Sequence, residues 1–205
     1  MTVHAQFHFD FGSPNAYLAH LVMPEIAART GVEIEYCPVL IGGVFKATNN
    51  VSPMVSLEGI KNKPEYQEIE TLRFLKRHSI TSYTENPYFP VNTLAIMRGA
   101  IYCQSFDYFG HYVSEVFRHM WCDPKKMDDP GVIHTALTAS GLPADDIIEA
   151  TQTPEVKQQL IANTEDSVNR GNFGSPTFFV GDEIFFGKDK LRDMEEEILE
   201  QQARS

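Results

Sequence analysis

The 205-residue sequence lacks the marks of several large classes of protein. Its three cysteines, Cys37, Cys103 and Cys122, form no Cys-x-x-Cys pair, and an odd number gives no disulfide framework. This usage predicts a reduced, cytoplasmic setting. No secretory signal is visible at the start, and no apolar run approaches the roughly 20 residues that a membrane-spanning helix needs. The seven histidines show no metal-ligand spacing, so no metal site is expected.

Basic charge is also scarce. The chain has 17 Lys and Arg against 28 Asp and Glu, which gives a formal net charge of −11. A surface of this sign opposes non-specific binding to nucleic acid or to anionic membranes, so neither is expected as a partner. A local pocket can still oppose the global sign and bind a small anion. Hydrophobic residues make up 42% of the chain, which is enough for a packed core.

What the sequence does contain is a clear succession of strand and helix patterns. Residues 5–11 and 32–40 alternate as strands do, and residues 14–30 between them have helical spacing. Residues 41–53 have the Gly-Gly and Asn-Asn-Val-Ser-Pro signals of a loop, with room for one helical turn. Only helical patterns recur from 56 to 168. A strand at 172–180, a turn at Gly181-Asp182, a return strand at 183–186 and a last helix complete the chain.

This order predicts an α/β protein with a thioredoxin-like fold, βαβ…ββα, that carries an all-helical insertion. We expect residues 1–55 and 169–205 to form the thioredoxin-like domain and residues 56–168 to form the inserted helical domain. Pro176 precedes the third strand, where a proline removes a ladder hydrogen bond. A cis peptide bond in a tight turn beside the first helix explains a proline at this position.

Ser13 lies where the first strand turns into the first helix. It suits the N-cap, and Pro14 suits the first helical position. A helix N-terminus offers free N–H groups and a partial positive charge, which favour an anion. Taken alone, however, capping is the commoner role of such a serine. Lys46 and Asn50 either face the same cleft or are solvated loop residues. The aromatic segment 85–93 either lines a pocket for a planar ligand or is pinned by its own rings.

Five segments together resemble a known family. They are DFGSPNAYLA at 10–19, FKATNN at 45–50, FPVNTL at 89–94, FGSPTFFV at 173–180 and FGKDKL at 186–191. In this order they resemble the 2-hydroxychromene-2-carboxylate isomerases. Those enzymes belong with the kappa-class glutathione transferases, and they share a thioredoxin fold carrying a helical insertion with bacterial disulfide oxidoreductases.

The resemblance implies glutathione as the cofactor and a catalytic Ser13 whose hydroxyl donates a hydrogen bond to the glutathione sulfur. It places the remaining glutathione contacts at Asn50, at the backbone of Ser175 before Pro176, and at Lys188 and Asp189. Position 175 is serine where an aliphatic residue is usual, and position 188 is lysine where serine or asparagine is usual. From motif position, the candidate substrate contacts are Phe45, Lys46, Tyr88, Phe89 and Asn92.

By the same resemblance, we expect a glutathione-dependent isomerase that converts 2-hydroxychromene-2-carboxylate to trans-o-hydroxybenzylidenepyruvate in aromatic catabolism. A homodimer is expected on this ground only. One alternative is a general kappa-like glutathione transferase or peroxidase with the same activated thiol. Another is a thioredoxin-fold binding protein in which Ser13 only caps the helix. A serine cannot form the mixed disulfide that a cysteine forms, so disulfide exchange by this chain itself is not expected.

Overall fold

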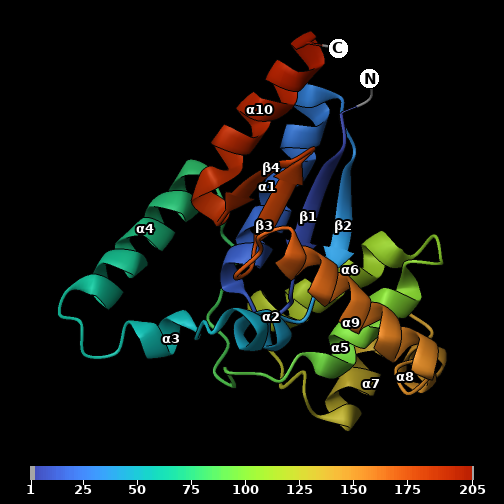
Figure 1. Ribbon diagram of the computed structural model, residues 1–205. Coiled ribbons are helices and arrows are strands. Elements are labelled where there is room, and N and C mark those ends of the chain that lie inside the picture. Colours follow the sequence, from blue (N-terminus) through green and yellow to red (C-terminus); the bar gives the residue numbers. More distant parts are fainter. Residues whose placement is uncertain (1–2, 205) are drawn as a thin grey trace.

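The computed structural model describes residues 3–204, and a four-stranded mixed sheet forms its centre (Figure 1). The strands are β1 (Ala5–Phe9), β2 (Ile34–Pro38), β3 (Thr177–Val180) and β4 (Glu183–Phe186), in the order β2-β1-β3-β4. β1 pairs in parallel with β2 and antiparallel with β3, and β3 pairs antiparallel with β4. This sheet confirms the predicted thioredoxin-like α/β fold.

Helix α1 (Pro14–Thr30) connects the two parallel strands and has the predicted limits. Ser13 caps it, because its Oγ accepts a hydrogen bond from the Ala16 N–H at 3.2 Å. Gly31 ends it in the left-handed region, with φ 70°. The other thioredoxin helix, α10 (Leu191–Arg204), follows a short 3-10 turn, η1 (Lys188–Lys190), and packs against α1 and β3.

The predicted loop at 41–53 is largely wrong, because residues Ile41–Thr48 form helix α2. The Ile41 N–H donates to the Asp10 carboxylate at 2.8 Å and the Leu40 N–H donates to Thr164 Oγ1 at 3.0 Å, so the start of α2 is fixed. A Cβ at Gly43 would lie 3.1 Å from Thr164 Cγ2. Gly43 therefore permits a close approach between two helices, a requirement that cannot be recognised from the local sequence.

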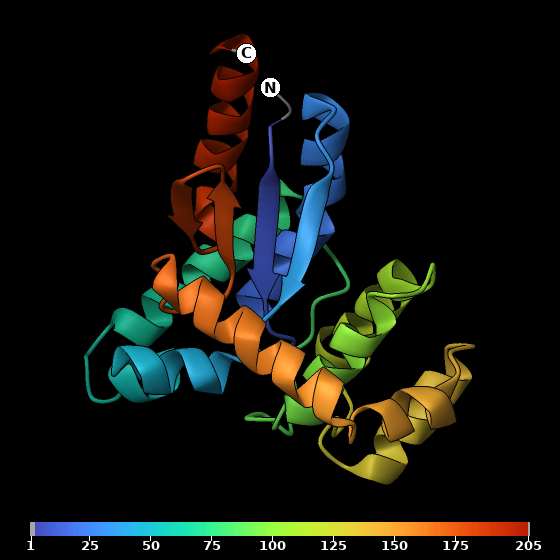
Figure 2. The ribbon, with the colours of Figure 1, turned by 45° about the vertical axis from the view of Figure 1, so that its right-hand side comes forward.

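The rest of the chain between β2 and β3 is helical, as predicted. α9 crosses the end of the sheet from which α1 and α2 begin, as Figure 2 shows. No helix within residues 3–204 is long and apolar enough to cross a membrane. The division into domains at 56 and 168 stays a prediction. The helices are α3 (Pro53–Ser56), α4 (Lys63–Arg77), α5 (Leu94–Cys103), α6 (Phe109–Trp121), α7 (Pro130–Ala139), α8 (Ala144–Ala150) and α9 (Pro154–Asn169).

An aromatic core joins the sheet to these helices. Phe9 and Phe11 are fully buried, and their ring centroids lie 5.7 and 4.8 Å from that of Phe117 on α6. The Trp121 Nε1–H donates to the Phe11 carbonyl at 2.7 Å. β1 ends at Phe9 rather than at the predicted residue 11, although Phe11 stays in the core. The segment after β1 is thus held rigidly where the site begins.

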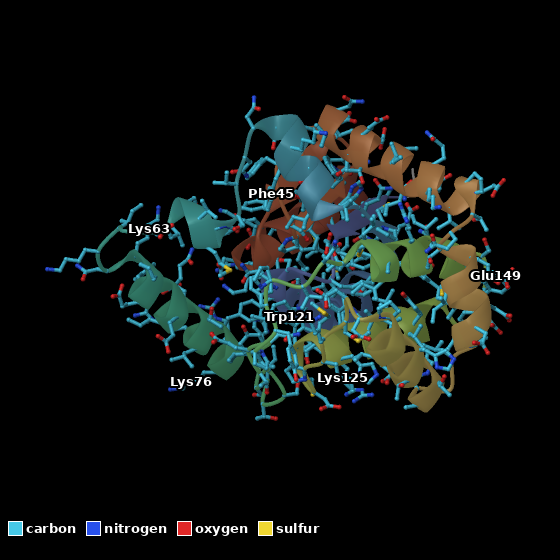
Figure 3. The ribbon with its side chains drawn as sticks, turned by 90° about the horizontal axis from the view of Figure 1, so that it is seen from below. Phe45, Lys63, Lys76, Trp121, Lys125 and Glu149 are labelled. Atoms are coloured by element: carbon cyan, nitrogen blue, oxygen red, sulfur yellow. The ribbon has the colours of Figure 1, made fainter. Side chains whose placement is uncertain are left out.

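Helices α3 and α4 pack less than the others. α4 fully buries one side chain, Phe74, in the part of the chain that the structure describes, and it extends away from the sheet in Figure 1. Seen from below in Figure 3, Lys63 and Lys76 mark this projecting helix, whereas Phe45 and Trp121 lie nearer the middle of the molecule. The buried Phe74 of α4 meets the body of the protein at Lys188, whose Nζ lies 5.1 Å from the Phe74 ring centroid.

Candidate active site

Ser13 lies against the turn that precedes β3. Its Oγ donates a hydrogen bond to the Ser175 carbonyl at 2.8 Å. Ser13 is buried, at 5% exposure. The Ser175–Pro176 peptide bond is cis, as predicted. The predicted tight turn beside α1 is therefore confirmed, and its two partners lie 162 positions apart in the sequence. The Phe89–Pro90 bond is also cis, which the sequence analysis did not predict.

Asp10 is a central residue of this site that the sequence analysis missed. One carboxylate oxygen accepts from the Gly12 N–H and the other from the Ile41 N–H, both at 2.8 Å. Burial raises the pKa of Asp10, although the two N–H donors and the Thr93 hydroxyl act in the opposite direction. Asp10 therefore joins the Ser13 turn to the start of α2. The sequence offered one signal for this role, an acidic residue directly after a hydrophobic strand.

Asp10 also gives a reason for the serine at position 175. The Asp10 backbone N–H donates to Ser175 Oγ at 3.1 Å. An aliphatic side chain at 175 could not accept this bond, and a buried N–H without a partner costs free energy. The serine hydroxyl thus fixes the cis-proline turn to β1, while the Ser175 carbonyl faces Ser13.

Asn50, two residues after the end of α2, contacts the same turn. Its Nδ2 donates to the Phe173 carbonyl at 2.8 Å, and its Oδ1 accepts from the Val51 N–H at 2.8 Å. The Phe173 ring packs on Phe186 of β4, with centroids 4.4 Å apart. Asn50 is exposed, so its amide lies at the surface of the site beside the turn that carries Ser175.

Lys188 and Asp189 lie at the end of β4. Lys188 is 5% exposed, and its Nζ donates to both Asp189 carboxylate oxygens at 2.9 and 3.0 Å. The ammonium also lies 5.1 Å from the Phe74 ring centroid of α4. Asp189 remains 63% exposed. The Gly187 N–H donates to the Pro176 carbonyl at 2.9 Å, so this pair is tied to the cis-proline turn. The predicted cofactor residues thus lie along one connected strip.

The predicted substrate residues lie on two separate elements. Phe45 is half-buried and Lys46 is exposed on α2. Tyr88 is 51% exposed, and Phe89 packs on Trp121 with centroids 5.6 Å apart. Asn92 Oδ1 accepts from the Leu94 N–H at 3.0 Å, at the start of α5. Within residues 3–204, no hydrogen bond or ring contact joins the α2 pair to the other three.

Cys37 is a partly buried thiol and Cys103 a buried one, and neither has nucleophilic character. Burial raises the pKa of the Cys37 thiol to about 12, assisted by the negative charge of Glu35 and opposed by Arg170. Burial likewise raises the pKa of Cys103 to about 12. A thiol of this kind is almost fully protonated at neutral pH and is a poor nucleophile. Cys37 and Cys103 therefore do not supply a reactive thiolate at neutral pH.

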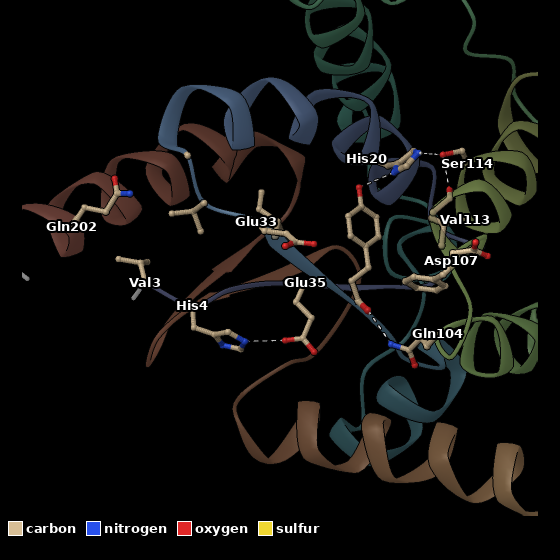
Figure 4. Close-up of a pocket in the computed structure, with 16 residues that line it drawn as sticks. Val3, His4, His20, Glu33, Glu35, Gln104, Asp107, Val113, Ser114 and Gln202 are labelled. Atoms are coloured by element: carbon tan, nitrogen blue, oxygen red, sulfur yellow. Dashed lines mark hydrogen bonds and ion pairs between the residues drawn. The ribbon is translucent and has the colours of Figure 1, made fainter. Parts of the chain in front are cut away.

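A separate pocket of about 1030 Å³ lies beside the edge strand β2 and is shown in Figure 4. Several of its polar side chains bond to one another. His20 Nδ1 lies 2.8 Å from the Tyr36 hydroxyl, and Gln104 Nε2 donates to the Tyr36 carbonyl at 3.2 Å. None of the predicted site residues lines this pocket, so the two regions are distinct.

Comparison with protein families settles the relationship that the fold suggests. Residues 5–199 match the model of the DSBA-like thioredoxin domain. The chain belongs to this family. The match covers the strip from Ser13 to Asp189, including both the cis-proline turn and the helical region.

Several named proteins are similar to this DSBA-like chain in sequence or in structure. A 2-hydroxychromene-2-carboxylate isomerase of Sphingobium xenophagum is 28% identical over 205 residues, covering 98% of this chain and 100% of the relative. Glutathione S-transferase kappa 1 of Homo sapiens is 22% identical, covering 83% of this chain and 78% of the relative. A solved 2-hydroxychromene-2-carboxylate isomerase has a TM-score of 0.83 at 24% identity, covering 100% of this chain and 97% of that one. The resemblance to this group of isomerases is confirmed.

Proposed function

We propose that this protein is a glutathione-dependent isomerase that converts 2-hydroxychromene-2-carboxylate to trans-o-hydroxybenzylidenepyruvate. The observation that carries the proposal is the position of Ser13. Its hydroxyl lies at the N-terminus of α1 and 2.8 Å from the Ser175 carbonyl before cis-Pro176. The isomerase name of a relative matched over its whole length supports the reaction, and the kappa-class relative supports glutathione as the thiol.

The energetics of thiol activation fit this arrangement. A free cysteine thiol has a pKa near 8.5, so about 3% is thiolate at pH 7. Lowering that pKa by about two units needs about 2.7 kcal/mol of preferential stabilisation of the anion. A helix N-terminus contributes about 0.3–1 kcal/mol, and a hydrogen bond to a charged acceptor about 1.5–3 kcal/mol. The Ser13 hydroxyl and the end of α1 together supply about the required amount.

To donate a hydrogen bond to the glutathione sulfur, the Ser13 O–H must turn away from the Ser175 carbonyl to which it donates in this structure. A thiolate is the better acceptor, since hydrogen bonds to ionised acceptors are roughly twice as strong as neutral ones. Ser13 can keep its capping bond from the Ala16 N–H during this change, because that bond uses a lone pair of Oγ. Capping and catalysis are therefore compatible roles of one hydroxyl.

The strip beyond Ser13 supplies groups for the rest of glutathione. We assign the Ser175 backbone and Pro176 to its cysteinyl part, and Asn50 to positioning the tripeptide through the 173–175 segment. Asp189 is exposed and negatively charged, so its carboxylate would accept from the γ-glutamyl ammonium group. Lys188 holds that carboxylate in place through the bonds at 2.9 and 3.0 Å.

In the proposed reaction, the glutathione thiolate adds to the double bond of the ring-opened substrate. The carbon–carbon bond that becomes single can rotate, and loss of the thiolate then restores the double bond in the trans arrangement. Glutathione is regenerated and nothing is oxidised or reduced. We assign Lys46 and Asn92 to the carboxylate and carbonyl of the substrate, and Phe45, Tyr88 or Phe89 to its ring. A homodimer and a cytoplasmic location stay predictions.

An absorbance assay of hydroxychromene carboxylate turnover, with and without glutathione, tests the proposal. Without glutathione we expect no turnover above the buffer rate. Ser13→Ala should lower kcat by roughly tenfold to a hundredfold, as expected for loss of one hydrogen bond to a charged acceptor. Ser13→Thr retains a hydroxyl and should recover much of the rate. Ser56→Ala, an exposed serine on α3, is the control. Full activity without glutathione, or full activity of Ser13→Ala, would contradict the proposal.

The kappa-class relative favours one second candidate, a broader glutathione transferase. It uses the same thiolate, but the thiolate stays bound to the product instead of leaving. Conjugation of chlorodinitrobenzene without isomerase activity would support this alternative. Failure of the wild-type protein to bind glutathione in calorimetry would instead support a thioredoxin-fold binding protein in which Ser13 only caps α1.

A further inference from the structure

A pocket of about 340 Å³ lies between α2, α5 and α9. Each helix contributes one cation: Lys46 from α2, Arg98 from α5 and Lys157 from α9. Glu165 on α9 also lines the pocket and is exposed. The remaining lining is mostly apolar and includes Leu40, Leu94, Leu160 and Ile161. Three positive charges around an apolar floor are unusual in a chain whose formal net charge is −11.

These cations have no anionic partner in the part of the chain that the structure describes. Neither Lys46, Arg98 nor Lys157 takes part in an ion pair there, and neither does Glu165. Arg98 and Lys157 are partly buried, and the Arg98 Nε is a buried atom without a hydrogen-bond partner among residues 3–204. A buried donor without an acceptor costs free energy. An anion in the pocket would give these three cations the charged partner that they lack within residues 3–204.

The pocket adjoins the Ser13 turn. Leu40 lines it, and the next residue, Ile41, is bonded to the buried carboxylate of Asp10 at 2.8 Å. Leu94 lines it too and follows Thr93, whose Cγ2 would lie 3.1 Å from a Cβ at Gly12. The wall of the pocket is thus built from residues that neighbour the segment that holds Ser13.

We propose that this pocket binds the carboxylate-bearing aromatic substrate, with Arg98 and Lys157 acting beside Lys46 as the groups that recognise its carboxylate. The assignment rests on the proposed function, which it makes more specific. The volume lies at the small end of the range typical of ligand pockets, about 300–1,000 Å³, which suits one small aromatic acid. The planar guanidinium of Arg98 can bind both oxygens of a carboxylate. Leu94 and Leu160 then offer the substrate ring an apolar surface inside the pocket.

Calorimetric titration with salicylate, an aromatic carboxylate, tests the site without requiring turnover. Wild-type protein should bind salicylate at least tenfold more tightly than the neutral analogue salicylamide. Arg98→Gln should weaken salicylate binding about tenfold, and Arg98→Gln combined with Lys157→Gln should weaken it further. Arg192→Gln, an exposed arginine on α10, is the matched control and should bind as the wild type does. Circular dichroism and thermal unfolding establish that each variant is folded.

Three results would overturn the proposal: no salicylate binding by the wild type, equal binding of salicylamide, or unchanged binding by folded Arg98→Gln. Steady-state kinetics separates this failure from failure of the proposed function. In an active enzyme, Arg98→Gln should raise KM for the substrate about tenfold, the double variant should raise it further, and both should leave KM for glutathione unchanged. An unchanged substrate KM removes the pocket but leaves the isomerase. A protein without isomerase activity whose salicylate binding depends on Arg98 removes the isomerase but leaves the pocket.

Discussion

His8, in the central strand β1, should make the protein sensitive to acid. Its side chain is buried, at 2% exposure, and its Nδ1 lies 2.8 Å from Ser167 Oγ. The Nε2 is buried without a hydrogen-bond partner among residues 3–204. Burial, followed by the positive charge of Arg170, lowers the pKa of His8 from 6.5 to about 4. The folded protein therefore holds this imidazole neutral at pH values where an unfolded chain would protonate it.

The sign and size of the effect follow from this difference in pKa. As the pH falls from about 6.5 to about 4, the unfolded state binds a proton at His8 that the folded state does not bind, so the free energy of unfolding decreases. Between pH 8 and pH 5 the decrease from this one group is about 2 kcal/mol, taking about 1.36 kcal/mol for each pKa unit. Burial also lowers the pKa of His20 and of His119 to about 4, so the wild type should lose more than this in total.

Urea denaturation at pH 8 and at pH 5 measures the contribution of His8 through the variant His8→Asn. Asparagine does not titrate, and its amide can still bond Ser167. Any cost of the smaller side chain applies at both pH values, so it cancels in the difference. We expect the loss of unfolding free energy between the two pH values to be about 2 kcal/mol smaller in His8→Asn than in wild type. His134→Asn, at an exposed histidine, is the control. Equal losses in His8→Asn and wild type would refute the reasoning.

Two further substitutions test the packing around the site by urea denaturation. Asp10→Asn keeps one acceptor oxygen, so either the Gly12 or the Ile41 N–H loses its partner, and we expect a loss of about 1–3 kcal/mol. The exposed Asp182→Asn should change little, and a fully stable Asp10→Asn would show that the carboxylate does not fix this turn. In Gly99→Ala, the new Cβ would overlap the Tyr112 hydroxyl and lie 2.9 Å from its Cζ, so we expect a loss of about 1–3 kcal/mol from overpacking. Gly110→Ala meets no atom within 4 Å and serves as the control; equal stability of the two alanine variants would contradict the packing.

Local patterns predicted the elements whose cause is local. The limits of α1 follow from Ser13, Pro14 and Gly31, and the structure has the same limits. The hairpin at Gly181 follows from its turn residues, and its strands β3 and β4 pair as expected. Helix α2 was not predicted because the residues that fix its position, Asp10 and Thr164, are distant from it in the sequence. Gly43 reads as a loop residue in the sequence, but it lies against Thr164 of α9, more than 100 residues away.

The same distinction applies to the site. The family resemblance assigned Ser13 and Ser175 to one site, and the structure joins them by a hydrogen bond of 2.8 Å. Asp10 begins the DFGSPNAYLA segment but was given no role, and Arg98 lies outside all five segments, because each acts through partners that only folding brings near. Asp10 shows the consequence most clearly. Its two oxygens accept from the Gly12 and Ile41 N–H groups, which lie 2 and 31 positions away in the sequence, and burial raises its pKa while these donors act in the opposite direction. The carboxylate thus holds the Ser13 turn to the start of α2, and the Asp10 backbone N–H holds Ser175, through contacts that no local sequence pattern indicates.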